Sequence, residues 1–227
     1  MHWIAIILTT AVLAALLYWL LVTTEGVYLG RRVVVWLYDI TAHRYDRIKE
    51  FDPDAEQFFV IRPLLVRLRQ VPNPLVLDVA TGTGRLPGFL LDAPTFNGRV
   101  VGLDASGKML RIALAKLRPY GPRASLVQQV ADRLPFAADQ FDLVTCLEAL
   151  EFFPSDTAAL QEMVRVLKPG GTLLVTRRKG SEAKLFVGRY RSVAQFEAVL
   201  TRLGLEEVHT NPWQVDYDQV FGRKPAA

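Results

Sequence analysis

The chain has 227 residues, of which 51% are hydrophobic and 22% charged, and its formal net charge is +4. This composition fits one well-buried domain with an appendage, and it excludes both a disordered chain and a protein with many membrane spans. The charge is too small to indicate nucleic acid, and we expect no nucleic-acid partner. The single cysteine, Cys146, excludes an intramolecular disulfide and a cysteine-based zinc site, and we expect no metal.

The first element is an apolar run without a charged residue, Trp3 to Val22. As a helix it would span roughly 30 Å, which matches the hydrocarbon core of a bilayer. We expect an uncleaved membrane anchor through residues 3–22, with a cleaved signal peptide and a buried core helix as alternatives. Arginines such as Arg31 and Arg32 follow the run, so we expect a single-pass membrane protein whose large domain is cytoplasmic.

Three parts are expected along the chain: an anchor over 1–24, a helical pre-domain over 25–72 and an α/β domain over 73–227. In the last part strands and helices alternate. The expected strands are Leu75–Ala80, Val100–Leu103, Ser125–Gln128, Phe141–Cys146 and Thr172–Thr176, then an antiparallel pair, Leu205–Thr210 and Gln214–Phe221. The expected helices are Arg85–Leu91, Lys108–Leu117, Thr157–Leu167 and Val193–Leu203. Lys168-Pro-Gly-Gly171 should be a turn between a helix and a strand.

This alternation predicts an α/β fold with a doubly wound, mostly parallel seven-stranded sheet. The sheet should end in a C-terminal antiparallel strand pair and be preceded by a single transmembrane helix. At the first strand-to-helix turn, Gly82 and Gly84 let the backbone bend sharply and approach a ligand. The dinucleotide-binding fingerprint requires a third glycine three residues after the second one. Proline, Pro87, occupies that position here, which argues against a dinucleotide cofactor. Asp104 ends the second strand, where a carboxylate can accept hydrogen bonds from ribose hydroxyls.

Four segments resemble class I S-adenosylmethionine-dependent methyltransferases, particularly the ubiquinone/menaquinone-biosynthesis-like group of methyltransferase type 11. The segments are Val76-Leu-Asp-Val-Ala-Thr-Gly-Thr-Gly84, Val101-Gly-Leu-Asp-Ala-Ser-Gly-Lys-Met-Leu110, Val130-Ala-Asp-Arg-Leu-Pro-Phe136 with Gln140-Phe-Asp-Leu-Val144, and Leu167-Lys-Pro-Gly-Gly-Thr-Leu173. Together they cover about residues 75–176. The resemblance implies a Rossmann-like fold and methyl transfer from S-adenosyl-L-methionine as cofactor. A membrane-tethered NAD(P)-dependent oxidoreductase and a non-catalytic binding or assembly module are the alternatives.

The resemblance also implies roles for particular residues. The cofactor-binding residues it indicates are Asp78, Ala80, Gly82, Gly84, Asp104, Ala105, Ala131, Asp132 and Leu147. Asp78 would lie under the methionine part of the cofactor, and Ala80, Gly82 and Gly84 would line its backbone cradle. Asp104 would hold the ribose, Ala131 and Asp132 the adenine edge. Leu147 and Glu148 would border the pocket. Arg85 departs from the group, which often has an acidic residue there.

The acceptor and the catalytic residues are less well indicated. An anchor suggests a small lipophilic or membrane-associated acceptor, such as a quinone precursor, an isoprenoid or a lipid. His43, Tyr45, Glu151 and Tyr190 could act as a base, but none is singled out, so the catalytic residues stay unknown, as does the oligomeric state.

The segment from Arg177 to Arg191 is rich in basic residues. They are Arg177, Arg178, Lys179, Lys184, Arg189 and Arg191, against the single acid Glu182. They predict either a solvated loop or a patch that faces anionic headgroups or an anionic substrate.

Overall fold

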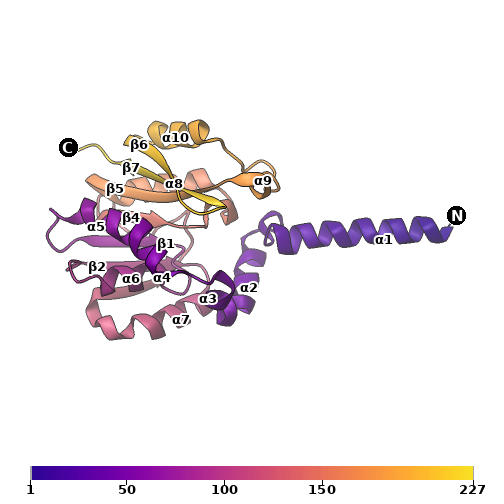
Figure 1. Cartoon of the computed structure of the whole chain (residues 1–227), viewed down its shortest axis with the longest axis horizontal. Coiled ribbons are helices and arrows are strands. Elements are labelled where there is room, and N and C mark those ends of the chain that lie inside the picture. Colours follow the sequence, from indigo (N-terminus) through magenta and orange to yellow (C-terminus); the bar gives the residue numbers. More distant parts are fainter. Residues whose placement is uncertain (1, 227) are drawn as a thin grey trace.

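A seven-stranded sheet forms the centre of the computed structural model, which describes residues 2–226 (Figure 1). The strand order is β3-β2-β1-β4-β5-β7-β6. The strands are β1 Leu75–Val79, β2 Arg99–Asp104, β3 Ala124–Gln128, β4 Phe141–Cys146, β5 Leu167–Arg178, β6 Glu206–Pro212 and β7 Tyr217–Arg223. The first five strands are parallel, and β7 pairs antiparallel with both β5 and β6. The predicted Rossmann-like sheet with an antiparallel C-terminal pair is confirmed.

Helices cover both faces of the sheet and bury a separate apolar core on each. One core lies under α8 Asp156–Val166 and α10 Val193–Arg202. The other lies under α5 Arg62–Leu68, α6 Arg85–Asp92 and α7 Gly107–Leu117. Both cores include fully buried β-strand residues such as Leu77 and Val76. The two-sided burial explains why the central strands are continuous apolar runs rather than alternating ones.

The predicted turn at Lys168–Gly171 lies inside β5, and that expectation was wrong. The strand begins at Leu167, where it pairs with Phe141, and the register then shifts so that Leu143 pairs with Thr172. Gly170 has a φ of 75°, so the two glycines make a bulge that absorbs the extra residues. A glycine pair following proline therefore bends this strand without ending it.

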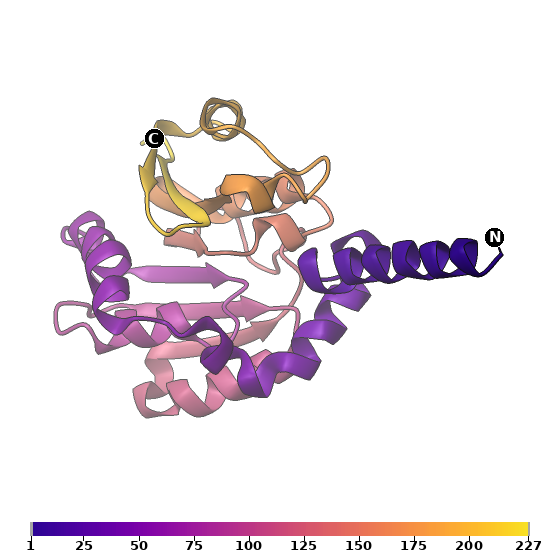
Figure 2. The ribbon, with the colours of Figure 1, turned by 45° about the vertical axis from the view of Figure 1, so that its right-hand side comes forward.

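The pre-domain consists of short helices, the first of which cross the carboxyl ends of the strands (Figure 2). They are α2 Arg31–Thr41, α3 Tyr45–Lys49, α4 Pro53–Glu56 and α5, with a π-helical turn at Gln57–Ile61. Only α5 and the turn before it pack deeply against the sheet, through Val60, Ile61 and Leu64. The other helices lie over the edge where a doubly wound sheet binds its ligands.

The N-terminal helix α1, His2–Tyr18, continues as a π-helical turn to Thr23 and projects away from the domain (Figure 1). The 22-residue span His2–Thr23 is long and apolar enough to cross a membrane, and none of its most apolar stretch is buried in the protein. The alternative of a buried core helix is therefore wrong.

Candidate functional site

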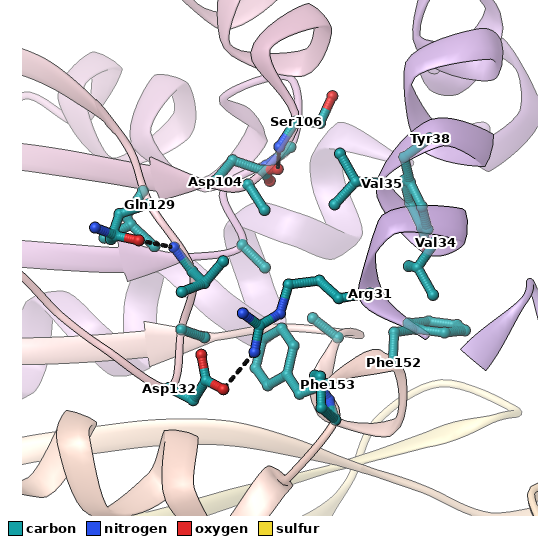
Figure 3. A pocket seen from close by; sticks show the side chains of 18 of the residues that line it. Arg31, Val34, Val35, Tyr38, Asp104, Ser106, Gln129, Asp132, Phe152 and Phe153 are labelled. Carbon is teal, nitrogen blue, oxygen red and sulfur yellow. Dashed lines mark hydrogen bonds and ion pairs between the residues drawn. The ribbon is translucent and has the colours of Figure 1, made fainter. Parts of the chain in front are cut away.

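The main pocket lies at the carboxyl ends of β1, β2 and β4, under helix α2 (Figure 3). Its open space is about 810 Å³, including solvent at the mouth, which is within the range of roughly 300–1,000 Å³ usual for small-molecule sites. The predicted residues that line it are Ala80, Gly82, Asp104, Ala105, Ala131, Asp132 and Leu147. Asp78 lines an adjoining smaller cavity beneath the glycine turn. Seven of the nine residues that the sequence predicts to bind the cofactor thus line one cavity.

The glycine turn after β1 bends through three residues with positive φ. Ala80 has φ 57°, Gly82 φ 55° and Gly84 φ 80°. Ala80 occupies the left-handed region where glycine is less strained. Gly84 does not line the pocket: it precedes α6, and a Cβ there would come within 3.2 Å of Ala113 in α7. Its absence of a side chain lets the turn pack against that helix.

The Asp104 carboxylate is held in place by backbone donors at the end of β2. The Gly82 N–H donates to one of its oxygens and the Ser106 N–H to the other, each at 2.8 Å. Burial raises the pKa of Asp104, and these two donors oppose that shift. A carboxylate oxygen accepts more than one hydrogen bond. Asp104 therefore keeps acceptor capacity toward the pocket that it lines.

Asp132 lies across the pocket from the glycine turn and forms an ion pair with Arg31 of α2 (Figure 3). Both side chains are partly exposed, 24% for Asp132 and 36% for Arg31. Ala131 beside it is buried and belongs to the core under α8. Arg31 was not among the predicted site residues, and its guanidinium lies against the carboxylate that the resemblance assigns to the adenine amine.

Asp78 is buried below the turn, one residue before the end of β1. It accepts a hydrogen bond from the Thr145 hydroxyl at 2.7 Å. Burial raises the pKa of Asp78 to about 6, although the Thr145 hydrogen bond opposes this shift. A buried carboxylate with this pKa gains stability from a cation placed beside it.

The pre-domain is tied to the strand ends by three polar contacts. Asp39 of α2 accepts from the Ser106 hydroxyl, and Asp46 of α3 accepts from the Thr83 hydroxyl in the glycine turn. Lys49 of α3 forms an ion pair with Glu148 at 3.0 Å. Between these ties, α2 presents apolar side chains to the pocket. They are Val34, Val35 and Tyr38, and Tyr45 of α3 joins them.

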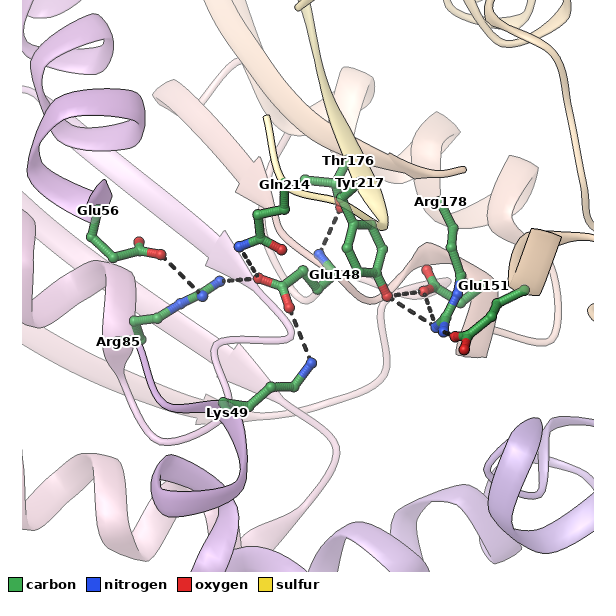
Figure 4. Close-up of polar contacts among 10 residues, drawn as sticks. Lys49, Glu56, Arg85, Glu148, Glu151, Thr176, Arg178, Gln214 and Tyr217 are labelled. Carbon is green, nitrogen blue, oxygen red and sulfur yellow. Dashed lines mark hydrogen bonds and ion pairs between the residues drawn. The ribbon is translucent and has the colours of Figure 1, made fainter. Parts of the chain in front are cut away.

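Glu148, just after β4, is the centre of a buried polar network (Figure 4). Its carboxylate accepts from Arg85 at 2.9 Å and Lys49 at 3.0 Å, and more weakly from Gln214 at 3.4 Å. Burial acts to raise the pKa of Glu148, but Arg85 and Lys49 together lower it, so the carboxylate is ionised at neutral pH. Arg85 also pairs with Glu56 at 3.2 Å, which explains how a basic residue is accommodated beside the glycine turn.

The comparisons with known proteins agree with this geometry. The family model described as a methyltransferase domain matches residues 76–171. The ubiquinone/menaquinone biosynthesis C-methyltransferase of Syntrophotalea carbinolica is 36% identical over 172 residues, which are 74% of this chain and 70% of that protein. The chain belongs to the class I S-adenosylmethionine-dependent methyltransferases.

Other relatives match over less of their length. The demethylmenaquinone methyltransferase of Lysinibacillus sphaericus is 37% identical over 55% of this chain and about half, 51%, of its own. The crystal structure of a methyltransferase of the same cofactor dependence from Aquifex aeolicus superposes with a TM-score of 0.63 at 19% identity, covering 82% of this chain and 97% of that one. That likeness supports the fold. The chain is an S-adenosylmethionine-dependent methyltransferase, not an oxidoreductase.

The donor set of the pocket fits S-adenosylmethionine. Asp104 offers a fixed carboxylate for ribose hydroxyls, and Asp132 offers an acceptor for an amine at the far end. Asp78 lies where it can balance a cationic ammonium group. A side chain at Gly82 would point toward the Tyr45 ring, whose Cε1 would be 3.7 Å away, so glycine keeps the space between the turn and the pre-domain open. The roles of the individual residues stay predictions.

Of the four residues considered as a base, Tyr45 lines the pocket. Burial raises its pKa above the usual value, so its hydroxyl is neutral at physiological pH. His43 is exposed on the pre-domain. Glu151 and Tyr190 line a separate cavity, where Glu151 is hydrogen-bonded to Tyr217 and paired with Arg178 (Figure 4).

Most of the basic side chains between Arg177 and Arg191 are engaged within the protein. Arg177 and Lys179 pair with Asp218, and Arg178 pairs with Glu151 and Glu182. Arg191 pairs with Asp156, and Arg189 donates to the carbonyls of Glu151 and Phe153. Five of the six basic side chains thus have partners within the protein, which weakens the hypothesis of a patch that faces anionic groups.

Proposed function

We propose that this methyltransferase methylates a ring carbon of a lipophilic quinone precursor at the cytoplasmic face of a membrane. The observation that carries the proposal is the composition of the pocket. Its polar groups at the strand ends are suited to the cofactor, whereas its opposite wall comes from the pre-domain that follows the N-terminal helix and, apart from Arg31, is apolar or aromatic. The relatives named for quinone biosynthesis support the acceptor class.

The apolar wall suits a flat, hydrophobic acceptor. Val34 and Val35 of α2 line the pocket together with the apolar side chains of Leu147 and Phe153. Burying such a ring removes apolar surface from water at about 25 cal/mol per Å². The cofactor supplies a methyl group that is already electrophilic, so alignment of the acceptor is the protein's main task.

Glu148 is the ionised carboxylate that lines this pocket beside the apolar wall. We assign it the task of accepting a hydrogen bond from a hydroxyl of the acceptor ring. Drawing that proton toward Glu148 makes the neighbouring ring carbon more nucleophilic. Arg85 and Lys49 fix the carboxylate in position.

The pair Glu148→Gln and Glu56→Gln tests this role, because both carboxylates bind Arg85 and only Glu148 lines the pocket. The chain in vesicles receives S-adenosylmethionine with a labelled methyl group and a demethylated menaquinone that has been chemically reduced to its quinol, because only the quinol carries the ring hydroxyl, and the labelled lipid is identified. We expect E148Q to lower kcat roughly tenfold to hundredfold and E56Q to keep most of it. An equal loss in both variants would assign Glu148 a structural role. Absence of labelled quinone with the unaltered chain, while another lipid is labelled, would refute the acceptor class.

A further inference from the structure

The loop after β5 makes a second connection to the N-terminal helix. This loop, residues 184–190, follows α9 Gly180–Ala183 and lies beside the base of α1 in both views (Figures 1 and 2). The Trp19 indole N–H donates to the Leu185 carbonyl at 3.2 Å, and the Tyr28 hydroxyl donates to the Val187 carbonyl at 2.8 Å. Trp19 and Tyr28 stack with their ring centroids 5.0 Å apart. Two hydrogen bonds to the loop backbone thus set its position relative to the apolar helix.

The side chains of this loop are divided between the protein and solvent. Phe186 is buried, at 2% exposure, and packs edge-on against Phe152 with the centroids 5.7 Å apart. Its neighbours Leu185 and Val187 are 42% and 66% exposed. The two exposed side chains flank the buried Phe186 that anchors the loop, so apolar surface remains uncovered in a loop whose backbone is hydrogen-bonded to Trp19 and Tyr28.

We propose that Leu185 and Val187 insert into the membrane interface as a second lipid contact, beside the helix His2–Thr23. The inference rests on the membrane location in the proposed function. Trp19 lies near the end of the apolar run, where tryptophan takes the headgroup level of a bilayer. A residue whose carbonyl is hydrogen-bonded to that indole lies within a few ångströms of the same depth. The contact is apolar because five of the six basic side chains of the segment are bound internally, as described above.

This contact also links the membrane to the pocket. Phe152 lines the pocket and touches both Phe186 of the loop and Tyr38 of α2. Val27, Val34, Phe152 and Phe186 form one small apolar cluster. Lipid binding by Leu185 and Val187 therefore fixes the pocket wall at the bilayer surface, where a lipid-dissolved acceptor enters without crossing water.

Fluorescent labels on single cysteines test the proposal in the full chain. Cys146 is buried and its thiol pKa is raised by burial, so the unaltered chain serves as the labelling blank. The test position is Val187→Cys. Val66→Cys on α5 is the matched control, because Val66 is 60% exposed and lies away from α1 (Figure 1). Val12→Cys, in α1 and 66% exposed, reports on the helix itself.

Each labelled chain is placed in phosphatidylcholine–phosphatidylglycerol vesicles and exposed to acyl-chain nitroxide or to aqueous iodide. We expect the labels at 12 and 187 to be quenched by the nitroxide and the label at 66 by iodide. A label at 187 that behaves like the one at 66, while the one at 12 is in lipid, overturns the second contact and leaves the anchor intact. Iodide quenching at 12 overturns the anchor and the contact together. A label at 187 shielded from both quenchers only at high protein density would indicate a second copy of the chain and overturn the lipid contact.

Discussion

The two walls of the pocket are built in different ways. The cofactor wall consists of strand ends and turns, where Gly82 and Ser106 backbone N–H groups hold Asp104. The opposite wall consists of side chains from α2 and α3, held by Asp39, Asp46 and Lys49. Backbone positions are fixed by the sheet, so the first wall is preorganised. The second depends on a few side-chain contacts, so it can adapt to an acceptor or move to admit one.

The largest effect is expected at the cofactor wall. Asp104→Ala removes the carboxylate that we propose as the acceptor for the two ribose hydroxyls, and it leaves the N–H groups of Gly82 and Ser106 without that partner. At about 1.5–3 kcal/mol for each of the two hydrogen bonds to a charged group, the loss is roughly 3–6 kcal/mol, or more than about a hundredfold in affinity. Calorimetric titration with S-adenosylhomocysteine measures it. Asp92→Asn, which alters the Tyr120 contact on the surface, should leave the affinity unchanged.

Asp78, below the cofactor wall, should make the stability of the folded chain depend on pH. Its folded pKa of about 6 is above its ordinary value of 3.8, so the folded chain favours the protonated form. That contribution to stability is complete below pH 3.8 and is lost as the pH rises through 6, which costs up to about 3 kcal/mol at neutral pH. Asp78→Asn should therefore raise the thermal stability of the cofactor-free protein at pH 7 and not at pH 4.

The same substitution should weaken cofactor binding and remove its pH dependence. A cationic ammonium favours ionised Asp78, so the unaltered chain should bind S-adenosylhomocysteine more tightly as the pH rises from 5 to 7. Equal slopes for the variant and the unaltered chain would show that Asp78 does not face the ammonium group.

The Arg31–Asp132 ion pair joins the two walls, and its removal has a smaller predicted effect. Surface ion pairs contribute about 0–1 kcal/mol, and if Asp132 binds the adenine amine as proposed, this pair competes with that contact. Arg31→Ala should raise cofactor affinity by up to about fivefold. Arg32→Ala, a neighbouring substitution that leaves the pair intact, is the control. A clear drop in affinity for R31A alone would mean that Arg31 contributes to cofactor binding.

Ala80→Gly is the smallest change. The positive φ of Ala80 strains an L-residue by about 1–2 kcal/mol, and glycine's greater freedom in the unfolded chain offsets part of the gain. We expect stabilisation by roughly 0.5–1 kcal/mol in denaturant unfolding. Ala115→Gly, at an exposed position within helix α7, should instead destabilise by about 1 kcal/mol. Destabilisation by both would show that the turn is not strained at Ala80.

The sequence predicts the cofactor wall because its signals are local. The strand, the glycines and Asp104 lie within 30 residues of one another, and their spacing alone defines a strand, a turn and a second strand end. The other wall carries no such signal. Arg31 and Asp132 are 101 residues apart and Lys49 and Glu148 are 99 apart, so only the fold brings them together. Val34 and Val35 look like any apolar helix residues.

The charges between Arg177 and Arg191 illustrate the same limit. A run of basic residues indicates a patch only if its acidic partners are elsewhere. Asp218 and Asp156 come from β7 and α8, and their pairing with Arg177 and Arg191 follows from sheet order. The bulge at Gly170 likewise depends on pairing with β4 rather than on the residues themselves. Local patterns predict elements, while long-range pairing decides which side chains remain free.

Surface dilution tests the central claim, that the acceptor is taken from the bilayer, most directly. The full chain is reconstituted with the reduced, quinol form of a long-tailed demethylated quinone at fixed total concentration, while the amount of lipid is increased. Uptake from the membrane predicts that the initial rate falls in proportion to the mole fraction of acceptor in the lipid. A rate that follows only the total concentration and is unchanged by added lipid would contradict the account.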